Sequence, residues 1–400
     1  MAKRKLNDWI SGYLEYADES EPPLSYHTWV SISLIAGVLQ RRTFFTWGYE
    51  IIYPNMYIVL IGPSGKCRKG TAMRMGYEIV KDVGIKIISE DITREAMIRN
   101  MKNSVENYLD PKDKKIRFHS SLSCFSEELS VFLGQNDIRF LSTLTNWYDS
   151  ADKWTYETKG SGTDTIQGLC FNLLGATASD WLVSILPQEA IGGGFTSRVI
   201  FVVEEEKRKT LPKPIFNSRI HRLMQALKAD LETIKTLNGP FVFTPETEEL
   251  YINWYEEQDI NNRKGNSAIS DPRFAGYCER RATHLRKLCM IFSVSRGSDM
   301  VVLPDDFTRA YNTMVAVEVK MPRVFGGLGM ARYSQITEKI LTFLSRRRGR
   351  VSRSELMLNF YRDMDMETLE IIERTLEAMK VIKLELETES REMYYTYTGP

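Results

Sequence analysis

The chain lacks the sequence features of several large protein classes. Its five cysteines are scattered and form no Cys-x-x-Cys pair, which argues against a disulfide framework and against a structural zinc site. No stretch approaches the roughly 20 apolar residues of a membrane span. The basic N-terminus is followed by no continuous apolar segment, so we expect no signal peptide. We therefore expect a reducing, cytoplasmic location and no membrane partner.

Charge and histidine give little direction either. The formal net charge is +1, so any surface for nucleic acid must be a local one. The four histidines lie far apart and form no recognisable ligand set. Hydrophobic residues make up 43% and charged residues 26% of the chain, which is ordinary for a globular protein with a buried core.

Four segments of the 400 residues differ in their pattern. Residues 1–50 predict a helical N-terminal region, and residues 51–215 predict an α/β core. Residues 216–325 are expected to be mostly helical. Gly326–Gly329 is typical of a linker, and residues 331–400 predict a compact C-terminal domain.

Strands and helices alternate through the core. The apolar run Met56–Ile61 has the length of a buried parallel strand, and a helix is expected over residues 70–82. Further strands are expected at Ile85–Ser89, Leu122–Ser126, Phe171–Leu174 and Arg198–Val203. Such alternation indicates a parallel α/β sheet with right-handed crossovers.

A glycine-bearing loop joins the first of these strands to its helix. In a P-loop, GxxxxGK[ST], backbone N–H groups cradle phosphates, a lysine reaches the β- and γ-phosphates, and a hydroxyl holds Mg²⁺. Here one residue is inserted, so that Arg68 replaces the last glycine, Lys69 is the lysine and Thr71 supplies the hydroxyl. The expected ATP-binding residues are Gly62, Pro63, Ser64, Gly65, Arg68, Lys69, Gly70 and Thr71.

Two other interpretations of this loop stay open. One uses the register Gly65-Lys66-Cys67, although a thiol is a poor ligand for Mg²⁺. The other is a plain glycine turn with solvated lysines. The flanking strand and helix lie where a P-loop needs them, which favours the binding of ATP and Mg²⁺.

Three polar residues follow later core strands. Glu127 is expected to bind the metal together with Thr71, and Glu128 to polarise the attacking water. Thr177 is expected to orient that water. The alternatives are that both glutamates open the following helix, stabilised by its dipole, and that Thr177 is a simple cap.

Arg198 ends a glycine-rich stretch. An arginine in this setting is a candidate arginine finger, which acts on the γ-phosphate bound by a neighbouring subunit. The alternative is a solvent-facing arginine in a salt bridge.

These motifs together resemble phage and mobile-element P-loop ATPases of the replicative helicase type. The resemblance covers about residues 20–325 and rests, in order, on Tyr53–Tyr57, Gly62–Ala72, Glu127–Ser130, Gly175–Thr177 and Gly194–Arg198. The layout is similar to AAA+ helicases of the minichromosome-maintenance and superfamily 3 kind. It implies an AAA+-like P-loop core with helical N-terminal and lid regions. It also implies a hexamer-type ring with ATP sites between subunits, in the bacterial cytoplasm if the chain is phage-encoded.

A polar stretch precedes the strand that carries Thr177. Residues 153–166 alternate in polarity and turn at Lys159–Gly162, which predicts a β-hairpin. In the helicases that the chain resembles, a hairpin at this place lines the ring pore and touches single-stranded DNA. Lys153 and Lys159 are therefore candidate DNA-binding residues, with Trp154 or Tyr156 available for stacking. The alternative is a surface hairpin whose aromatic side chains lie in the core.

Two further regions carry candidate contacts. Three helices and two strands in residues 331–400 follow the winged-helix pattern, with a basic cluster at 346–353. The third of these helices carries four glutamates, which disfavours base reading, so contact with the nucleic-acid backbone or with a partner protein is expected. Arg281 and Arg286 are candidate lid arginines near the γ-phosphate, unless they belong to a solvated basic face.

The sequence thus predicts an ATP-dependent single-stranded DNA translocase or replicative helicase that works as an oligomeric ring. Replication proteins are further candidate partners. Two alternatives stay open: a regulatory or loading ATPase that does not unwind DNA, and a nucleic-acid-binding adaptor with a degenerate P-loop.

Overall fold

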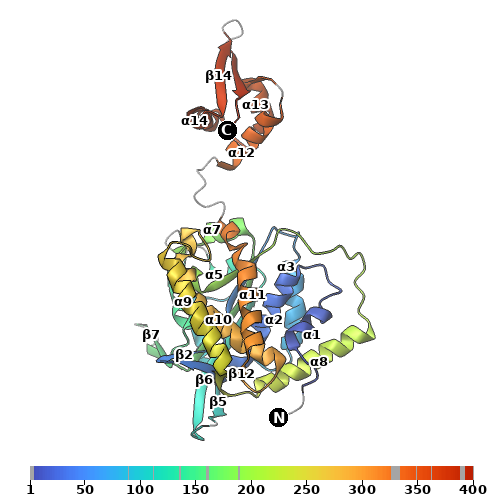
Figure 1. The fold of residues 1–400 in the computed structure, drawn as a ribbon, viewed down its shortest axis with the longest axis vertical. Coiled ribbons are helices and arrows are strands. Elements are labelled where there is room, and N and C mark those ends of the chain that lie inside the picture. The colour runs from blue at the N-terminus through green and yellow to red at the C-terminus, as the bar shows by residue number, and fades with distance from the viewer. Residues whose placement is uncertain are drawn as a thin grey trace. The chain divides into compact units, whose positions relative to one another are not determined.

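The computed structural model describes residues 4–88, 90–110, 112–134, 137–158, 162–187, 190–325, 334–347, 349–361, 363–387 and 392–399. The chain divides into two compact units, Met1–Phe325 and Gly326–Pro400 (Figure 1). The segments 1–50, 51–215 and 216–325, which differ in sequence pattern, lie together in the first unit.

The central sheet of the first unit has the order β10-β3-β9-β6-β4, and every pair along this path is parallel. Its strands are β3 (Tyr57–Ile61), β4 (Ile87–Ile88), β6 (Ile116–Ser126), β9 (Leu169–Thr177) and β10 (Val199–Val203). β3 and β10 are buried along their whole length, which explains their continuous apolar sequence. The expected α/β fold with a mostly parallel sheet is confirmed.

Helices connect these strands. They are α3 (Lys69–Val80), α4 (Arg94–Asn103), α5 (Leu129–Leu133), α6 (Ile138–Tyr148) and α7 (Ser179–Ile185). Thr93 caps α4, because its hydroxyl accepts the N–H of Ala96 at 3.3 Å. Between α4 and β6 lies β5 (Val105–Leu109), an antiparallel partner of β6 that the sequence pattern did not reveal.

The first two helices, α1 (Trp9–Tyr16) and α2 (Leu24–Leu39), pack against α8 (Ser218–Lys235). α2 also lies against β3, β9 and β10 of the central sheet. The Asp230 carboxylate of α8 accepts the N–H groups of Lys5 and Leu6, at 2.7 and 3.0 Å. The N-terminal region is therefore held by a segment more than 200 residues away in sequence.

Residues 216–325 are not only helical, and here the sequence-based expectation is incomplete. Besides α8, they form α9 (Pro245–Arg263), α10 (Ala275–Arg296) and α11 (Pro304–Glu318). They also contribute two strands to a second sheet with the order β12-β11-β1-β2. Its strands are β1 (Thr43–Trp47), β2 (Glu50–Ile52), β11 (Gly239–Phe243) and β12 (Val301–Val302). β11 pairs in parallel with β1, so it depends on a partner that is remote in sequence.

The second unit contains the three helices and two strands that its sequence predicts. They are α12 (Ser334–Arg346), α13 (Arg353–Phe360), α14 (Met366–Ala378), β14 (Ile382–Glu387) and β15 (Glu392–Tyr397). A short β13 (Val351–Ser352) completes an antiparallel sheet. Part of the expected basic cluster is neutralised within the unit, because Arg350 pairs with Glu387 and Arg353 with Glu373, both at 2.8 Å.

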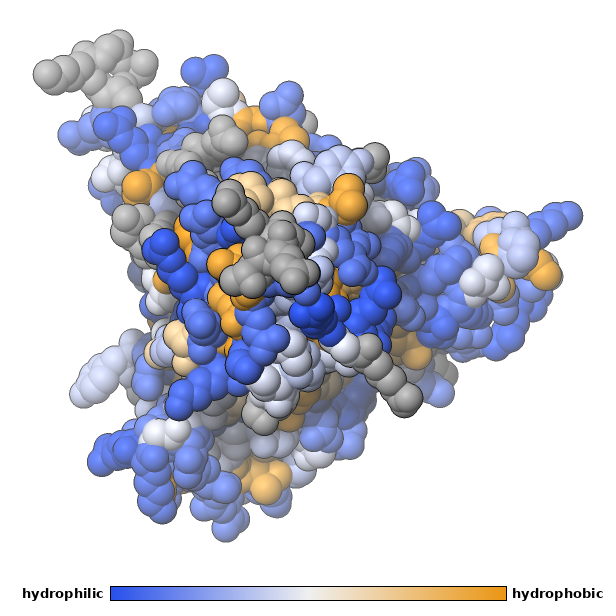
Figure 2. All heavy atoms as spheres, turned by 90° about the horizontal axis from the view of Figure 1, so that it is seen from above, coloured by the Kyte–Doolittle hydropathy of each residue, from blue (hydrophilic) through white to orange (hydrophobic). Residues whose placement is uncertain are grey.

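The face of the molecule in Figure 2 is largely hydrophilic, with hydrophobic residues in small separate groups. Among the residues that the structure describes, no helix combines the length and the apolar character needed to cross a membrane.

Candidate functional site

The loop after β3 is anchored on several sides. The N–H of Gly62 donates to the carbonyl of Thr177 at the end of β9 (3.3 Å). The carbonyl of Ile61 accepts from the Tyr26 hydroxyl of α2 (2.6 Å) and from the N–H of Glu204, which follows β10 (2.9 Å). Both neighbours of β3 in the sheet, together with α2, therefore fix the place where the loop begins.

Packing requires glycine at position 62. A Cβ there would lie 2.5 Å from the Glu204 carbonyl oxygen and 2.6 Å from the Tyr26 hydroxyl. The Cys67 thiol closes the same spot, because its Sγ donates to that carbonyl at 3.2 Å. A backbone oxygen in a fixed strand extension cannot move aside, so only hydrogen is tolerated at Gly62.

Helix α3 presents its N-terminus to this loop. Arg68, just before the helix, has a left-handed backbone (φ 57°), and so does Gly65 (φ 73°). The first N–H groups of a helix have no partner within it, and the helix dipole favours an anion at this end. The stretch from Gly62 to Lys69 therefore has the backbone chemistry of an anion-binding loop at the carboxyl end of a parallel strand.

The two lysines of the loop differ in position. The Lys69 ammonium folds back and donates to the carbonyl groups of Gly62 and Pro63. Burial lowers the pKa of Lys69, while nearby Cys67 and Glu128 act in the opposite direction. Lys66 is exposed. Of the two registers, the structure places the ammonium of Lys69, rather than that of Lys66, over the loop.

Glu127 lies against the first turn of α3, on the side of Gly70. A Cβ at Gly70 would stand 2.5 Å from the Glu127 carboxylate. Arg74, one turn further along α3, pairs with this carboxylate at 3.7 Å and donates to the Gly70 carbonyl at 3.2 Å. Burial raises the pKa of Glu127; the Arg74 charge lowers it, and Glu90 and Glu128 raise it further.

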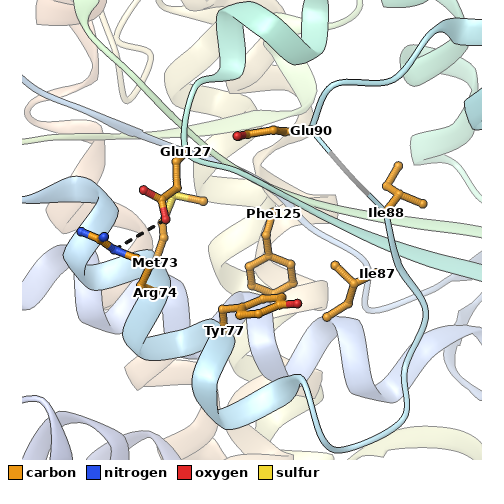
Figure 3. Close-up of a pocket in the computed structure, with 8 residues that line it drawn as sticks. All are labelled: Met73, Arg74, Tyr77, Ile87, Ile88, Glu90, Phe125 and Glu127. Atoms are coloured by element: carbon orange, nitrogen blue, oxygen red, sulfur yellow. Dashed lines mark ion pairs between the residues drawn. The ribbon is translucent and has the colours of Figure 1, made fainter.

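Figure 3 shows the cavity of about 350 Å³ beside this ion pair, between α3 and the carboxyl ends of β4 and β6. The Glu90 carboxylate points toward Glu127, and it accepts the N–H of Glu128 at 3.3 Å. The rings of Tyr77 and Phe125 meet edge to face within the cavity. Glu128 is the residue before α5, and its side chain is exposed.

Thr71 follows Gly70 in the first turn of α3 but faces a different side of the helix. It lines a second, more apolar cavity of about 380 Å³, together with Met75 and Phe216. Arg68 lines this cavity too and pairs with Glu21 at 2.9 Å. The structure therefore brings Glu127 to Gly70 and separates it from Thr71, the other expected metal ligand.

Thr177 lies next to the loop, as its place at a strand end predicts. It pairs in register with Ile61, and its carbonyl accepts the Gly62 N–H. Its side chain is buried, and the hydroxyl donates to the carbonyl of Ala178 at 3.3 Å.

Arg198 lies at the amino-terminal ends of the parallel strands, whereas the loop lies at their carboxyl ends. It precedes Val199, whose register partner is Tyr57 at the start of β3. The side chain is 9% exposed, and it donates to the Asp149 carboxylate at 2.7 Å and to the Gly194 carbonyl at 2.8 Å. This arginine is thus paired inside its own chain, rather than solvent-facing.

The expected hairpin is present as β7 (Lys153–Thr158) and β8 (Gly162–Gln167). Lys153 is exposed, whereas Lys159 lies outside the described residues. Both aromatic side chains are half-buried: Trp154 meets Trp147 edge to face, and Tyr156 lies under the Arg94 guanidinium at 4.7 Å. The second interpretation of the hairpin, with aromatic side chains packed against the body, describes these two residues.

The two candidate lid arginines are each paired with a carboxylate. Arg281 is buried and forms a two-pronged pair with Glu318, at 2.7 and 2.8 Å. Arg286 is buried and pairs with Glu50 of β2 at 3.0 Å. Both therefore connect α10 to neighbouring elements instead of forming a solvated basic face.

A buried lysine that the motifs did not single out lies near Arg198. The Lys287 ammonium of α10 donates to the backbone and side-chain oxygens of Asn55, at 2.9 and 2.8 Å, and lies 4.1 Å from the centre of the Tyr148 ring. Burial lowers the pKa of Lys287 to about 7. Its only sequence signal is a lysine beside Arg286 in a stretch, Leu285–Phe292, whose other residues are apolar.

Lys287 should make the stability of the protein depend on pH. In the unfolded chain a lysine has a pKa of about 10.4, so the unfolded state binds this proton more tightly than the folded state between pH ~7 and ~10. The free energy of unfolding should therefore rise with pH across this window. We expect it to rise more steeply in the parent protein than in Lys287→Met, measured by denaturant unfolding. Parallel pH profiles would show that Lys287 stays charged when folded.

Among the described residues, no group of three or more His, Cys, Asp or Glu side chains is placed to hold a metal ion. No protein-family model matches the chain, and no curated protein matches it either.

Proposed function

We propose that the chain binds and hydrolyses ATP at the Gly62–Thr71 loop. The observation that carries this proposal is the meeting of three features at one sheet edge. The loop holds the Lys69 ammonium over its own carbonyl groups, and α3 points its N-terminus at the loop. Glu127 and Glu128 follow β6, which is separated from β3 by the single strand β9. Ligands of open α/β sheets bind at the carboxyl ends of the strands, where the order of connections reverses, and β3 stands at such a point.

The loop offers the groups that phosphate transfer requires. Lys69 can leave the Gly62 and Pro63 carbonyl groups and reach the phosphates. Its positive charge then stabilises the negative charge that develops on the phosphate in the transition state. Glu128 is exposed and has room to accept a proton from water. The apolar cavity lined by Thr71 and Phe216 lies next to the loop and has the size of a small-molecule site, so it suits the nucleoside part of ATP.

Glu127 fits the role of a Mg²⁺ ligand, and Thr71 does not share that role here. Mg²⁺ is usually held by one or two carboxylates, substrate phosphates and water, and it neutralises phosphate charge when bound. The Glu127 carboxylate lies against Gly70, at the start of α3, whereas Thr71 lines the other cavity. Arg74 shields Glu127 in this structure and has to yield to a metal.

We further propose that ATP hydrolysis drives movement along single-stranded DNA in a ring of subunits. The hairpin β7–β8, with exposed Lys153, and the C-terminal unit, with its expected winged-helix order, support this reading. The pairing of Arg198 with Asp149 counts against an arginine that acts between subunits, so the second candidate, a regulatory ATPase without unwinding activity, stays open. For Arg198 to act on a neighbouring nucleotide, it must first leave Asp149.

The test is ATP hydrolysis by the full chain with and without oligo-dT, combined with strand displacement and mass measurement. A DNA motor should hydrolyse ATP at least severalfold faster with oligo-dT, form a defined oligomer with an ATP analogue, and displace a paired strand. Hydrolysis without strand displacement would indicate the regulatory ATPase. Absence of nucleotide binding would leave only the adaptor.

A further inference from the structure

A two-stranded ribbon extends from the central sheet at the amino-terminal end of β6, whereas the proposed phosphate loop lies at the carboxyl ends of the strands. β6 pairs with β9 only from Ser120 onward, so its first residues, Ile116–His119, pair with β5 alone. Figure 1 shows β5 and β6 projecting beyond the body of the first unit. The ribbon comprises the described residues from 105 to 120, with Asp110 and the polar residues 112–115 between its two strands.

One face of this ribbon carries exposed apolar side chains around Asn107, the register partner of Phe118. Val105, Leu109, Ile116 and Phe118 are 48%, 54%, 63% and 54% exposed. The register places Leu109 opposite Ile116, so these side chains share a face. The other face is directed inward, where the Tyr108 and His119 rings lie 5.8 Å apart. A projecting ribbon gains no folding energy from an exposed apolar face, and such a patch marks an interaction site.

The turn at the end of the ribbon is positively charged. Lys112, Lys114 and Lys115 are exposed, and none of them forms an ion pair within the part of the chain that the structure describes. Arg117 uses the two local carboxylates, Asp110 at 3.3 Å and Asp113 at 2.7 Å. The three lysines therefore keep their charge available to a polyanion.

We propose that this ribbon binds single-stranded nucleic acid, with a base stacked on Phe118 and phosphates bound by the three turn lysines. An exposed aromatic ring beside a cluster of cations is the combination that binds single strands without sequence preference. The β7–β8 hairpin lacks an equally open ring, because Trp154 and Tyr156 are packed against Trp147 and Arg94. This inference rests on the proposed action on nucleic acid and assigns a contact surface for it.

A second copy of the chain suits this face less well. A stable protein interface buries about 800 Å² on each partner. Four half-exposed side chains offer much less apolar area than that. Lysine is also a residue type that is depleted at the cores of protein interfaces, and three lysines lie in the turn of this ribbon. The chemistry of the ribbon matches a base and its phosphates, which need only a stacking ring and a few cations.

The test measures binding of fluorescent oligo-dT and oligo-U to the full chain by anisotropy at several salt concentrations. Phe118→Ala should weaken binding about tenfold, and Phe118→Trp should retain it. The triple variant Lys112→Ala/Lys114→Ala/Lys115→Ala should flatten the slope of log K against log salt by about 2, since each phosphate contact contributes ~0.7. Tyr255→Ala/Lys264→Ala, which removes an exposed ring and an exposed lysine at α9, should bind like the parent chain. The two oligomers distinguish DNA from RNA as the natural strand.

ATP hydrolysis without oligonucleotide, measured on the same samples, separates this inference from the proposed function. Ribbon variants should hydrolyse ATP at the parent rate, because the ribbon lies far along β6 from the phosphate loop. Parent-like oligonucleotide affinity and salt slope in the ribbon variants would overturn the ribbon inference and leave the ATPase proposal standing. Loss of oligomeric mass with unchanged affinity would make the ribbon a subunit interface instead. A further combination of results is no ATP hydrolysis by the parent chain together with loss of oligonucleotide binding in the ribbon variants. That result would overturn the ATPase proposal and leave the ribbon inference standing.

Discussion

Lys69→Ala should lower the rate of ATP hydrolysis by about 10²–10³-fold, the usual effect of removing one group that stabilises charge in the transition state. In the folded chain this ammonium already lies within the loop, on the carbonyl groups of Gly62 and Pro63, and burial lowers its pKa. A phosphate group can replace those carbonyl groups as its partner. The measurement is steady-state phosphate release by the full chain.

Lys66→Ala is the matched control, because Lys66 belongs to the same loop but is exposed. This variant should retain most of the parent rate. If Lys66→Ala is inactive and Lys69→Ala is active, the register with Gly65-Lys66-Cys67 is the correct one. Thermal unfolding of Lys66→Ala should match the parent chain, whereas Lys69→Ala should lower the melting temperature slightly, because it loses the hydrogen bonds to the Gly62 and Pro63 carbonyl groups.

Glu128→Gln should bind ATP but hydrolyse it at least ~10²-fold more slowly, because a glutamine cannot take a proton from water. Glu128 is exposed at the start of α5, and its N–H, rather than its carboxylate, contacts Glu90. The substitution therefore leaves the local structure intact. Nucleotide binding by a fluorescent ATP analogue and single-turnover hydrolysis measure the two steps separately.

Glu127→Gln provides the comparison for this experiment. Its carboxylate pairs with Arg74 and lies against Gly70, so its loss should raise the Mg²⁺ concentration needed for hydrolysis. Glu128→Gln should leave that concentration unchanged. A normal turnover rate in Glu128→Gln would remove this residue from the mechanism, and reversed behaviour of the two variants would exchange their roles.

The sequence revealed the strands whose signals are local and missed those that depend on remote partners. β3 and β10 are continuous apolar runs, and both appear where the pattern places them. β11 begins with Gly239-Pro240, and β12 is two residues long, so neither has a signal of its own. They exist because β1 offers β11 a parallel edge, which no local window of sequence contains.

The candidate site shows the same division. Strand-to-loop patterns located the Gly62 loop, the two glutamates after β6 and Thr177 at one edge of the sheet. The sequence did not predict which side chains on different elements pair with each other. Arg74 with Glu127 and Arg198 with Asp149 each join residues about 50 positions apart. The separation of Thr71 from Glu127 follows from the roughly 100° rotation between adjacent helix residues, which places Gly70 and Thr71 on different sides of α3.

The anchoring of the Gly62–Thr71 loop also determines when this loop can form during synthesis. Residues 62–69 leave the ribosome early, yet the loop entrance is closed by the Glu204 backbone, and the Glu204 side chain pairs with Lys320 at 2.7 Å. The N-terminal residues add further long connections, with Arg4 donating to the Val294 carbonyl. Contacts this far apart in sequence carry a high loop-closure cost and form late. Nascent chains that end before residue 204 should therefore expose an unformed loop to protease and to chaperones, and the proposed nucleotide site should mature only when most of the first unit has been made.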